Sequence, residues 1–202
     1  MARKASLRKR RLAEPATLER LTLRVTLHGV EPAIWREISL PDSYSLFQLH
    51  RCIQLVFGWL DYHLFEFQVD GQAFVGPGND AEGALAQQVA LSELDLAVGS
   101  RLLYVYDFGD DWEHEIEVRA IATRVVAEDG KLAHVLGGAR AAPPEDSGGP
   151  FGYSETLAAL KAATDEDDEA RVDWIGKDFD PELFDRRAVN HALMLATAWG
   201  VI

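Results

Sequence analysis

The sequence predicts an α+β fold, with a mixed, mostly antiparallel sheet, a helix packed across one face of the sheet, and a helical C-terminal part. Near the N-terminus, two segments alternate apolar and polar residues; an amphipathic helix follows, and further alternating segments precede the last helices. A period of two is typical of strands, and apolar spacings of three and four are typical of helices. The prediction rests on this order of hairpin, helix, strands and final helices.

The first two predicted strands form a hairpin. Residues 18–28 carry an apolar side chain at every second position from Leu21 to Leu27, which is typical of a strand with one buried face. Residues 29–32 include glycine and proline and turn the chain, and residues 34–40 alternate again. A hairpin followed by a helix and more strands is the order of a β-grasp, so we expect a topology of that kind.

The first predicted helix has signals at both ends. Ser45 can cap its N-terminus, and Gln48, three residues later, completes a capping box. Apolar residues then follow at spacings of three and four from Leu46 to Val56. Gly58 suits the left-handed position that ends many helices. The sequence therefore predicts a helix that ends just before Gly58.

The middle of the chain predicts a second group of strands. Alternating segments predict strands at residues 64–69, 101–107, 112–126 and 131–136. Residues 71–90 are rich in glycine, asparagine and aspartate and predict a loop, which is followed by a short helical turn at residues 91–94. Asp129 and Gly130 form a hairpin-turn signal.

The character of the sequence changes after Ala139. Residues 142–150 contain three prolines and two glycines, which neither a helix nor a strand tolerates, so we expect an ordered loop or an extended linker. A helix is predicted at residues 154–163. The acidic run at residues 165–169 is expected to be solvated.

The last predicted helix runs to Ala198. Asp180 can cap its N-terminus, and Pro181 suits the first helical position. Phe179 and Phe184 stand at the two positions of a hydrophobic staple. The expected organisation is a basic, disordered arm, a sheet domain, and a loop with C-terminal helices packed on that same domain, at residues 1–17, 18–138 and 139–202.

The charge of the chain is unevenly placed. The formal net charge is −13 at pH 7, yet the first twelve residues carry six basic residues and no acid. Subtracting those six positive charges leaves −19 for the remainder. A body this acidic repels phosphate backbones, so nucleic acid is not an expected partner of the folded part. The basic arm either contacts nucleic acid or an acidic partner, or is a solubilising terminus.

Composition also bears on membranes and on the compartment. The longest apolar stretch, residues 192–202, is about half the length that a bilayer requires. No segment has the layout of a secretory signal. Cys52 is the single cysteine and has no internal disulfide partner. We therefore expect a cytoplasmic protein with no membrane partner.

The densest group of chemically active residues spans residues 107–114. Asp107, Asp110 and Asp111 crowd the turn between two predicted strands, where three carboxylates repel unless a cation, an arginine or backbone N–H groups meet them. Strand alternation places Trp112 and His114 on one side of the outgoing strand. Glu113 falls on the other side.

Two interpretations of this turn stay open. Oxygen-rich clusters suit Mg²⁺, Mn²⁺ or Ca²⁺, so the turn can hold a divalent metal or act in general acid–base chemistry. The candidate ligands are Asp107, Asp110, Asp111 and His114. Alternatively, the aspartates bond to the backbone of a hairpin turn, beside a partly buried histidine. The spacing matches no established metal loop.

A second candidate segment spans residues 145–153. Glu145 and Asp146 precede Gly148 and Gly149, and Tyr153 begins the next predicted helix. Paired glycines permit positive φ angles or the close approach of a ligand or another backbone segment. This loop either closes over the turn at residues 107–114 to complete a pocket, or simply connects the sheet to the C-terminal helices.

The remaining candidates have simpler interpretations. Trp35, Trp59 and Trp112 can line a ligand groove but are more typical of a core. His50 and His63 are expected to be surface or capping residues. Cys52 is expected to be a buried thiol. The sequence contains no phosphate-binding loop, dinucleotide fingerprint or nucleophile elbow.

Two motifs carry a resemblance to a known family. The segments Tyr-Asp-Phe-Gly-Asp-Asp-Trp-Glu-His at residues 106–114 and Pro-Pro-Glu-Asp-Ser-Gly-Gly-Pro-Phe-Gly-Tyr at residues 143–153 resemble the plasmid pRiA4b open-reading-frame family. Members of that family are also named transposon passenger proteins of a TnpR-like type. Shorter stretches fit the same pattern at residues 30–36, 57–59 and 178–181. The resemblance covers residues 21–190 and implies an α+β fold and an association with bacterial plasmids and mobile elements. It brings no established activity.

The sequence departs from the family pattern at one point. Relatives often have cysteines at the positions of Ala142 and Ser147, so a thiolate zinc site of such relatives is absent from this chain. The TnpR-like name implies a serine recombinase. That chemistry needs a nucleophilic serine, nearby arginines and a basic DNA-binding surface, and the acidic body supports none of these.

Two functions are therefore expected as alternatives. The first is a non-enzymatic binding module that engages a partner protein or a small ligand through the turn at residues 107–114 and the loop at residues 145–153. The second is a hydrolase or nuclease that depends on a divalent metal, the one cofactor that the sequence suggests. Its metal would be surrounded by Asp107, Asp110, Asp111, Glu113, His114, Glu145 and Asp146.

Overall fold

The computed structural model describes residues 17–125 and 132–202. Its strands are β1 (Thr17–Leu27), β2 (Trp35–Pro41), β3 (Phe65–Val69), β4 (Gln72–Val75), β5 (Ala84–Leu85), β6 (Arg101–Tyr106), β7 (Trp112–Val125) and β8 (His134–Ala139). Its helices are α1 (Leu46–Phe57), α2 (Gly149–Lys161), α3 (Glu166–Ile175) and α4 (Arg186–Ala198), with short 3-10 turns η1 (Ala86–Gln88) and η2 (Leu91–Glu93). The expected turn at Asp129 and Gly130 and nearly all of the expected basic arm lie outside the described residues. Among the described helices, none is long and apolar enough to cross a bilayer.

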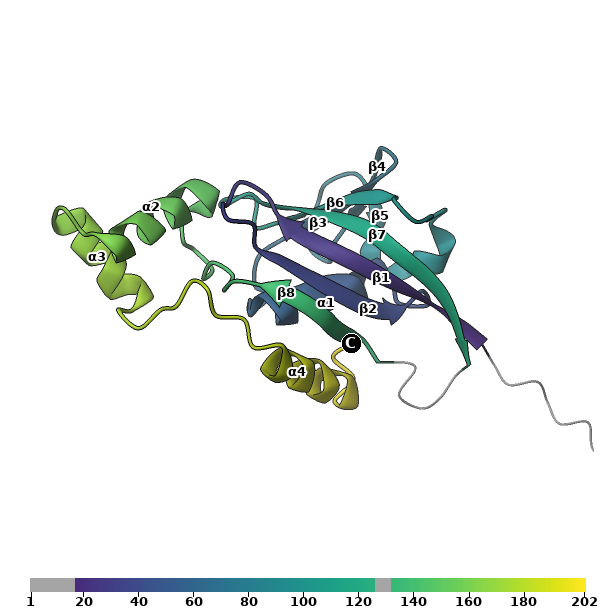
Figure 1. Cartoon of the computed structure of the whole chain (residues 1–202). Helices are drawn as coiled ribbons and strands as arrows, with labels where there is room; N and C mark the ends of the chain where they lie inside the picture. Colours follow the sequence, from purple (N-terminus) through teal and green to yellow (C-terminus); the bar gives the residue numbers. More distant parts are fainter. Residues whose placement is uncertain (1–16, 126–131) are drawn as a thin grey trace, which may run out of the picture.

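The strands form one eight-stranded sheet in the order β5-β4-β3-β6-β7-β1-β2-β8. All neighbouring strands are antiparallel except β4 and β5, which are parallel. In Figure 1, α4 lies beside β8, and α2 and α3 lie beyond one end of the sheet. The predicted α+β class, with a mixed and mostly antiparallel sheet and a helical C-terminal part, is confirmed.

The buried face of the sheet follows from strand alternation. Leu23 pairs with Ile38 on one side and with Val118 on the other, and all three side chains are fully buried. Because side chains at alternate positions share a face, the other inward residues of β1 are buried as well. The sheet therefore has one apolar face that a helix must cover.

Helix α1 covers this face and has the predicted ends. The Ser45 hydroxyl accepts a hydrogen bond from the backbone N–H of Gln48 (3.2 Å), and the Gln48 side chain accepts one from the N–H of Ser45 (2.9 Å). Gly58 ends the helix with φ +77°. The apolar face packs into the core, where Leu49 and Ile53 are fully buried. The predicted capping box and C-terminal glycine are confirmed.

A buried arginine joins α1 to the edge of the sheet. The Arg36 guanidinium donates to the backbone carbonyls of Val56 (2.9 Å), Ala139 (2.8 Å) and Arg140 (2.8 Å). These carbonyls belong to the last turn of α1 and to the end of β8. Burial lowers the pKa of Arg36 to about 10, so the side chain stays charged at neutral pH.

Several boundaries differ from the prediction because local signals were ambiguous. Helix α4 begins at Arg186, and Asp180 instead accepts hydrogen bonds in a turn from the N–H groups of Glu182 and Leu183. Asp185 caps α4 through the N–H groups of Arg187 and Ala188. An Asp-Pro pair suits a turn as well as a helix start, so the predicted start was wrong.

Two other predictions were incomplete. Residues 71–90, expected to be a loop, contain β4, β5 and η1, because the glycines occupy the turns between short strands. Helix α2 begins at Gly149 rather than near Ser154, with Pro150 in its first turn. The acidic run at residues 165–169 belongs to α3, whose cap is Asp165.

Candidate functional site

The turn after β6 and the loop before α2 are in direct contact. The backbone N–H of Gly148 donates to Asp110 Oδ2 (3.1 Å). Gly149 adopts φ +67°, and a Cβ atom there would overlap the backbone oxygen of Asp110. Both the positive φ and the close approach require glycine at this position. Residues 107–111 and 145–149, which are far apart in the sequence, therefore form one surface, here called the junction.

Glu145 ties the junction to two other segments. Its Oε2 accepts from the backbone N–H of Leu60 (2.9 Å), and its Oε1 accepts from the hydroxyl of Tyr106 (2.5 Å) at the end of β6. Burial, reinforced by this bond, raises the pKa of Tyr106 well above its usual range, so the hydroxyl remains a donor. Trp59 adds a hydrogen bond from its indole N–H to the carbonyl of Pro143 (2.9 Å).

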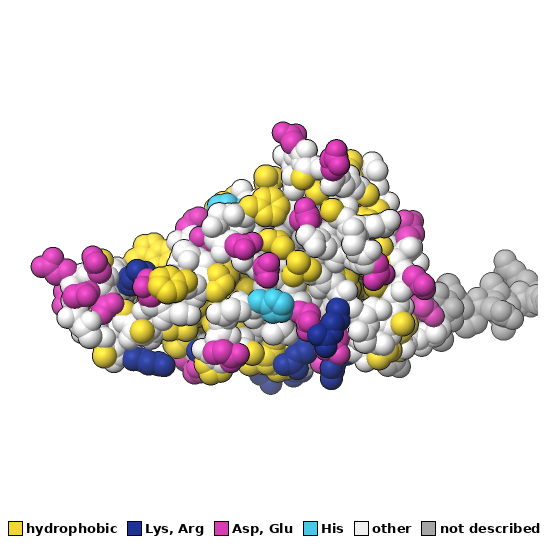
Figure 2. Space-filling view, turned by 90° about the horizontal axis from the view of Figure 1, so that it is seen from above, with side chains coloured by type: hydrophobic (Ala, Val, Ile, Leu, Met, Phe, Trp, Pro, Cys, Tyr) yellow, Lys and Arg dark blue, Asp and Glu magenta, His cyan; other side chains and the backbone are white. Residues whose placement is uncertain are grey.

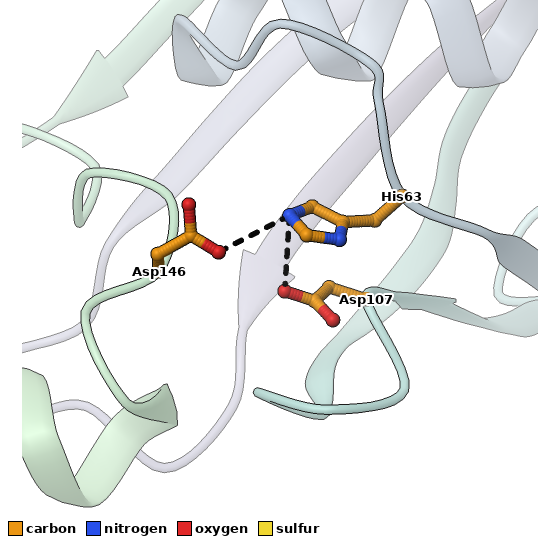
Figure 3. Close-up of side chains that lie close together, drawn as sticks. All are labelled: His63, Asp107 and Asp146. Carbon is orange, nitrogen blue, oxygen red and sulfur yellow. Dashed lines mark ion pairs between the residues drawn. The ribbon is translucent and has the colours of Figure 1, made fainter.

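Asp146 and Asp107 both face His63 (Figure 3). His63 Nε2 lies 3.3 Å from Asp146 Oδ1 and 3.5 Å from Asp107 Oδ2. The second oxygen of Asp146 accepts from the Tyr62 hydroxyl (2.9 Å), a bond that raises the pKa of Tyr62 to about 12. In the described part of the chain, these residues form the one group of three or more ligand-type side chains close enough to hold a metal ion.

The aspartates of the turn have different environments. Asp107 is nearly buried with φ +57°, and its Oδ1 accepts from the N–H of Gly109 (3.0 Å). The N–H of Asp111 donates to the backbone carbonyl of Asp107 (2.6 Å). Asp110 contacts Gly148 as described above. The Asp107 carboxylate therefore bonds to the backbone of the turn, whereas the Asp110 carboxylate bonds to the backbone of the loop before α2.

His114 and Trp112 lie in the core, away from the acidic turn. Both are fully buried, and His114 Nδ1 lies 3.0 Å from the carbonyl of Trp112. The imidazole packs edge-on against Phe57 and Trp59. Burial lowers the pKa of His114 to about 3, so the ring is neutral at physiological pH. The structure does not place this imidazole beside the three aspartates, because strand alternation directs residue 114 under α1.

Two further candidates also lie apart from the junction. Glu113 projects from the opposite side of β7, 3.8 Å from His28. Tyr153 is fully buried and packs edge-on against Phe179, and its hydroxyl has no hydrogen-bond partner within the described residues. The candidate residues that the structure brings together are Asp107, Asp110, Glu145, Asp146, Gly148 and Gly149.

His63 and Tyr62 are the site residues that sequence reasoning missed. Both precede β3, which pairs antiparallel with β6, so the start of β3 lies next to the end of β6. The N–H of Asp107 donates to the carbonyl of Leu64 (2.9 Å), which fixes this neighbourhood. The pairing of β3 with β6 is what brings these residues to the site, and neither strand's own sequence indicates that the two strands pair.

The histidine on α1 also has a different role from the one expected. His50 is buried, not a surface or capping residue. Its Nδ1 lies 2.8 Å from the Tyr104 hydroxyl and its Nε2 lies 2.6 Å from Asp61 Oδ1. Arg51 in turn pairs with Asp61 (2.8 Å). This network holds the segment before β3, and therefore the positions of Tyr62 and His63, against α1.

Large exposed apolar side chains belong to the segments that meet at the junction. Leu60 and Phe151 are each 75% exposed, and Tyr62 and Phe108 are about half exposed. Leu60 and Tyr62 take part in the hydrogen bonds to Glu145 and Asp146, and Phe108 and Phe151 lie within two residues of the contacts of Asp107 and Gly149. Acidic side chains are scattered over the view in Figure 2, whereas lysine and arginine gather in a few places. The junction is thus a fixed acidic surface with an apolar rim.

Two known proteins are similar to most of this chain. A protein named uncharacterized protein y4hQ, from Sinorhizobium fredii, is 34% identical over 182 residues, which cover 88% of this chain and 92% of that protein. The crystal structure of a protein of unknown function, MM3350 from Methanosarcina mazei Go1, is similar with 36% identity and a TM-score of 0.75, and the match covers 85% of this chain and 97% of that one.

A family model agrees with these matches. The model described as plasmid pRiA4b ORF-3-like protein matches residues 19–188, which include most of β1, the junction and the beginning of α4. Both segments of the junction therefore lie within the matched region. The resemblance inferred from the motifs at residues 106–114 and 143–153 is confirmed. The chain belongs to the plasmid pRiA4b ORF-3-like family.

Proposed function

We propose that the chain is a non-enzymatic binding module that recognises a segment of a partner protein through the junction. The observation that carries this proposal is the group of exposed apolar side chains around a network of fixed contacts. The side chains are Leu60, Tyr62, Phe108 and Phe151. Soluble proteins rarely gather large apolar side chains on their surface unless the surface has a partner.

The rim side chains stand on backbone that the junction holds in place. The N–H of Leu60 is bonded to Glu145, and Phe108 lies in the turn that Asp107 and Asp110 stabilise. Phe151 lies in the first turn of α2, immediately after the close contact of Gly149. Anchors on fixed backbone lose little conformational entropy on binding, which favours affinity.

The acidic charge of the junction defines the partner. The two segments of the junction carry five acidic residues, Asp107, Asp110, Asp111, Glu145 and Asp146, and the chain as a whole carries a net charge of −13. Complementarity therefore favours a segment with lysine or arginine next to apolar anchors. Two shallow depressions can receive those anchors, one lined by Phe47, Arg51 and Tyr62 and the other by Asp146, Arg171 and Trp174.

The family suggests the setting of this interaction. Membership of the pRiA4b ORF-3-like family favours a partner encoded with plasmids or mobile elements. The unpaired, buried Cys52 favours the cytoplasm as the compartment. The recognition surface takes residues from both the sheet domain (18–138) and the C-terminal part (139–202), which we therefore regard as one unit.

Peptide binding tests the proposal directly. Fluorescent peptides of about 12 residues, in three classes, are titrated with the full chain in EDTA and followed by anisotropy. One class combines basic and aromatic residues, one is acidic and aromatic, and one is basic without large apolar residues. We expect the first class to bind at least about tenfold more tightly than either of the others. Equal affinities for the three classes would contradict the proposal.

Surface variants locate the binding site. The double variant Phe108→Ala and Phe151→Ala removes two rim side chains that are exposed, so folding should be unaffected. We expect it to weaken binding of the basic and aromatic class by about tenfold or more. The matched control is Leu183→Ala with Trp199→Ala, which removes two exposed apolar side chains near α4. An equal loss of peptide affinity in this control would contradict binding at the junction.

The metal-dependent hydrolase remains the second candidate on one observation only. Asp107 and Asp146 converge on His63. In contrast, Glu145 and Asp110 accept hydrogen bonds from backbone N–H groups, and His114 lies in the core. The hydrolase hypothesis places seven carboxylate and imidazole groups around one ion, and it therefore has less support than the binding module.

A further inference from the structure

We propose that His63, Asp107 and Asp146 bind a divalent first-row transition-metal ion, with Zn²⁺ as the reference ion. The site joins His63 to both segments of the junction, and the ion does not need the partner peptide in order to bind. Asp107 and Asp146 are among the residues that the sequence suggested around a metal, whereas His63 is not. The inference rests on three features: the spacing of the donor atoms, the state of the histidine nitrogen, and the groups that orient each carboxylate.

The donor atoms already have the spacing of a metal site. His63 Nε2 lies 3.5 Å from Asp107 Oδ2 and 3.3 Å from Asp146 Oδ1, and each of the three residues offers a ligand atom within 4.8 Å of those of the other two. Ligand atoms at about 2.0–2.2 Å from a tetrahedral ion are separated from each other by about 3.3–3.6 Å. Two of the three separations therefore fit a shared ion as they stand, and the exposed Asp146 side chain can adjust the third.

The histidine nitrogen makes no hydrogen bond. His63 Nε2 is a buried atom without a hydrogen-bond partner among the described residues, although two carboxylate oxygens lie within 3.5 Å of it. A hydrogen bond requires the N–H to point at its acceptor, and the nitrogen is aligned with neither oxygen. In Figure 3 it faces the space between the two carboxylates. A cation between the three atoms accounts for this arrangement.

Each carboxylate has one oxygen held by a donor and the other directed at His63. Asp107 Oδ1 accepts from the N–H of Gly109 (3.0 Å), and Asp146 Oδ2 accepts from the Tyr62 hydroxyl (2.9 Å). Groups of this kind orient metal ligands and strengthen metal binding. Both oxygens that face His63 are therefore presented to an ion without a loss of other hydrogen bonds.

The imidazole ring is also held in place. It lies between Tyr62, with ring centroids 4.5 Å apart, and Tyr106, which it meets edge-on at 5.8 Å. Its backbone N–H lies 3.4 Å from the Tyr106 hydroxyl, which donates to Glu145. The ligand set is therefore preorganised by contacts from three segments of the chain.

The donor set selects the class of ion. One imidazole nitrogen and two carboxylate oxygens suit Zn²⁺ and similar transition ions, whereas Mg²⁺ and Ca²⁺ favour oxygen ligands alone. Three protein ligands leave at least one position for water or a ligand group. The Asp146 side chain is 62% exposed, so the ion can exchange with solvent. Bound there, the ion joins the loop before α2 to the end of β6.

Calorimetric titration of the full, untagged chain with Zn²⁺ tests this site in the absence of peptide. We expect one high-affinity ion for each chain, and an affinity at least about tenfold lower in His63→Ala and in Asp146→Asn. Asp146→Asn is the safer variant, because the side chain is exposed and the amide can still accept from Tyr62. Mg²⁺ and Ca²⁺ should bind at least about tenfold more weakly than Zn²⁺.

Two controls separate this site from general attraction to an acidic surface. His28→Ala removes another histidine near a carboxylate, 3.8 Å from Glu113, and Glu113→Gln removes the charge of that carboxylate, which lies apart from the junction. Both should keep the affinity of the unaltered chain within about twofold. Absence of Zn²⁺ binding by the unaltered chain, or equal losses in His28→Ala and His63→Ala, would overturn the proposal. Because peptide binding is measured in EDTA and Zn²⁺ binding without peptide, failure of either proposal leaves the other standing.

Discussion

At the scale of single residues, Gly149 determines how closely the two segments of the junction approach. Replacement by alanine imposes a left-handed backbone on a side chain, at about 1–2 kcal/mol, and also places a Cβ atom against the backbone of Asp110. We expect Gly149→Ala to lower the free energy of unfolding by more than about 2 kcal/mol in urea denaturation.

The control for this variant is Gly71→Ala. Gly71 also has a positive φ of +79°, but a Cβ atom there meets nothing within 4 Å. Its replacement should therefore cost only the left-handed conformation, about 1–2 kcal/mol. If both variants lose the same free energy of unfolding, the contact between Gly149 and Asp110 does not contribute to stability.

His114 gives the folded protein a dependence on pH. Its pKa is lowered to about 3 by burial, from an ordinary value of 6.5, so the unfolded chain takes up a proton below about pH 6.5 that the folded chain refuses until about pH 3. The stabilising effect of the neutral ring is therefore complete above pH 6.5 and is lost as the pH falls toward 3. The slope from this residue is at most about 1.4 kcal/mol per pH unit.

The corresponding variant is His114→Phe. Its free energy of unfolding, measured between about pH 7 and pH 4, should fall less steeply than that of the unaltered chain. Parallel profiles for the unaltered chain and His114→Phe would contradict the assignment of His114 as a buried neutral group.

At the scale of secondary-structure elements, Arg36 links α1, β2 and β8. Replacement by methionine leaves the carbonyls of Val56, Ala139 and Arg140 without their donor in a buried environment. We expect Arg36→Met to lower the free energy of unfolding by about 3–5 kcal/mol. Arg24→Met is the control, because Arg24 stacks on the Trp35 ring at 4.0 Å, and it should cost less than about 1 kcal/mol. Similar losses in the two variants would contradict the structural role of Arg36.

Elements with complete local signals were predictable from the sequence. The start of α1 is marked by the reciprocal hydrogen bonds of Ser45 and Gln48, which are three residues apart, so its prediction required no tertiary information. The start of α4 could not be predicted from the sequence, because Asp180 and Asp185 are both suitable caps and packing decides between them. Asn190, on α4, exchanges two hydrogen bonds with the backbone of Val135 on β8, and these long-range bonds fix where the helix lies.

The candidate site was predictable only in part for a related reason. The glycines at residues 148 and 149 indicated a close approach, and the structure places them against Asp110. In contrast, the contribution of His63 depends on the pairing of β3 with β6, which neither strand specifies alone. His114 looked like a ligand beside Asp111 in the sequence, but strand alternation directs it into the core.

At the scale of the whole molecule, the net charge of −13 shapes the interaction that we propose. An acidic surface attracts a basic segment at a distance, and dissolved salt screens that attraction. We expect the affinity for the basic and aromatic peptide to fall roughly tenfold when NaCl rises from about 50 mM to about 500 mM. The apolar rim should retain the residual affinity. A peptide affinity that does not change with salt would contradict a contribution of charge complementarity to binding.

The most direct measurement of the central claim is a nuclear magnetic resonance map of where the basic and aromatic peptide binds. The full chain, labelled with ¹⁵N and kept in EDTA, is titrated with the peptide, and shifts of backbone amide signals are followed. We expect the largest shifts in all three of the segments 60–63, 107–111 and 145–152, which contact one another in the folded chain. Shifts confined to α4, or to one of these three segments alone, would contradict this claim.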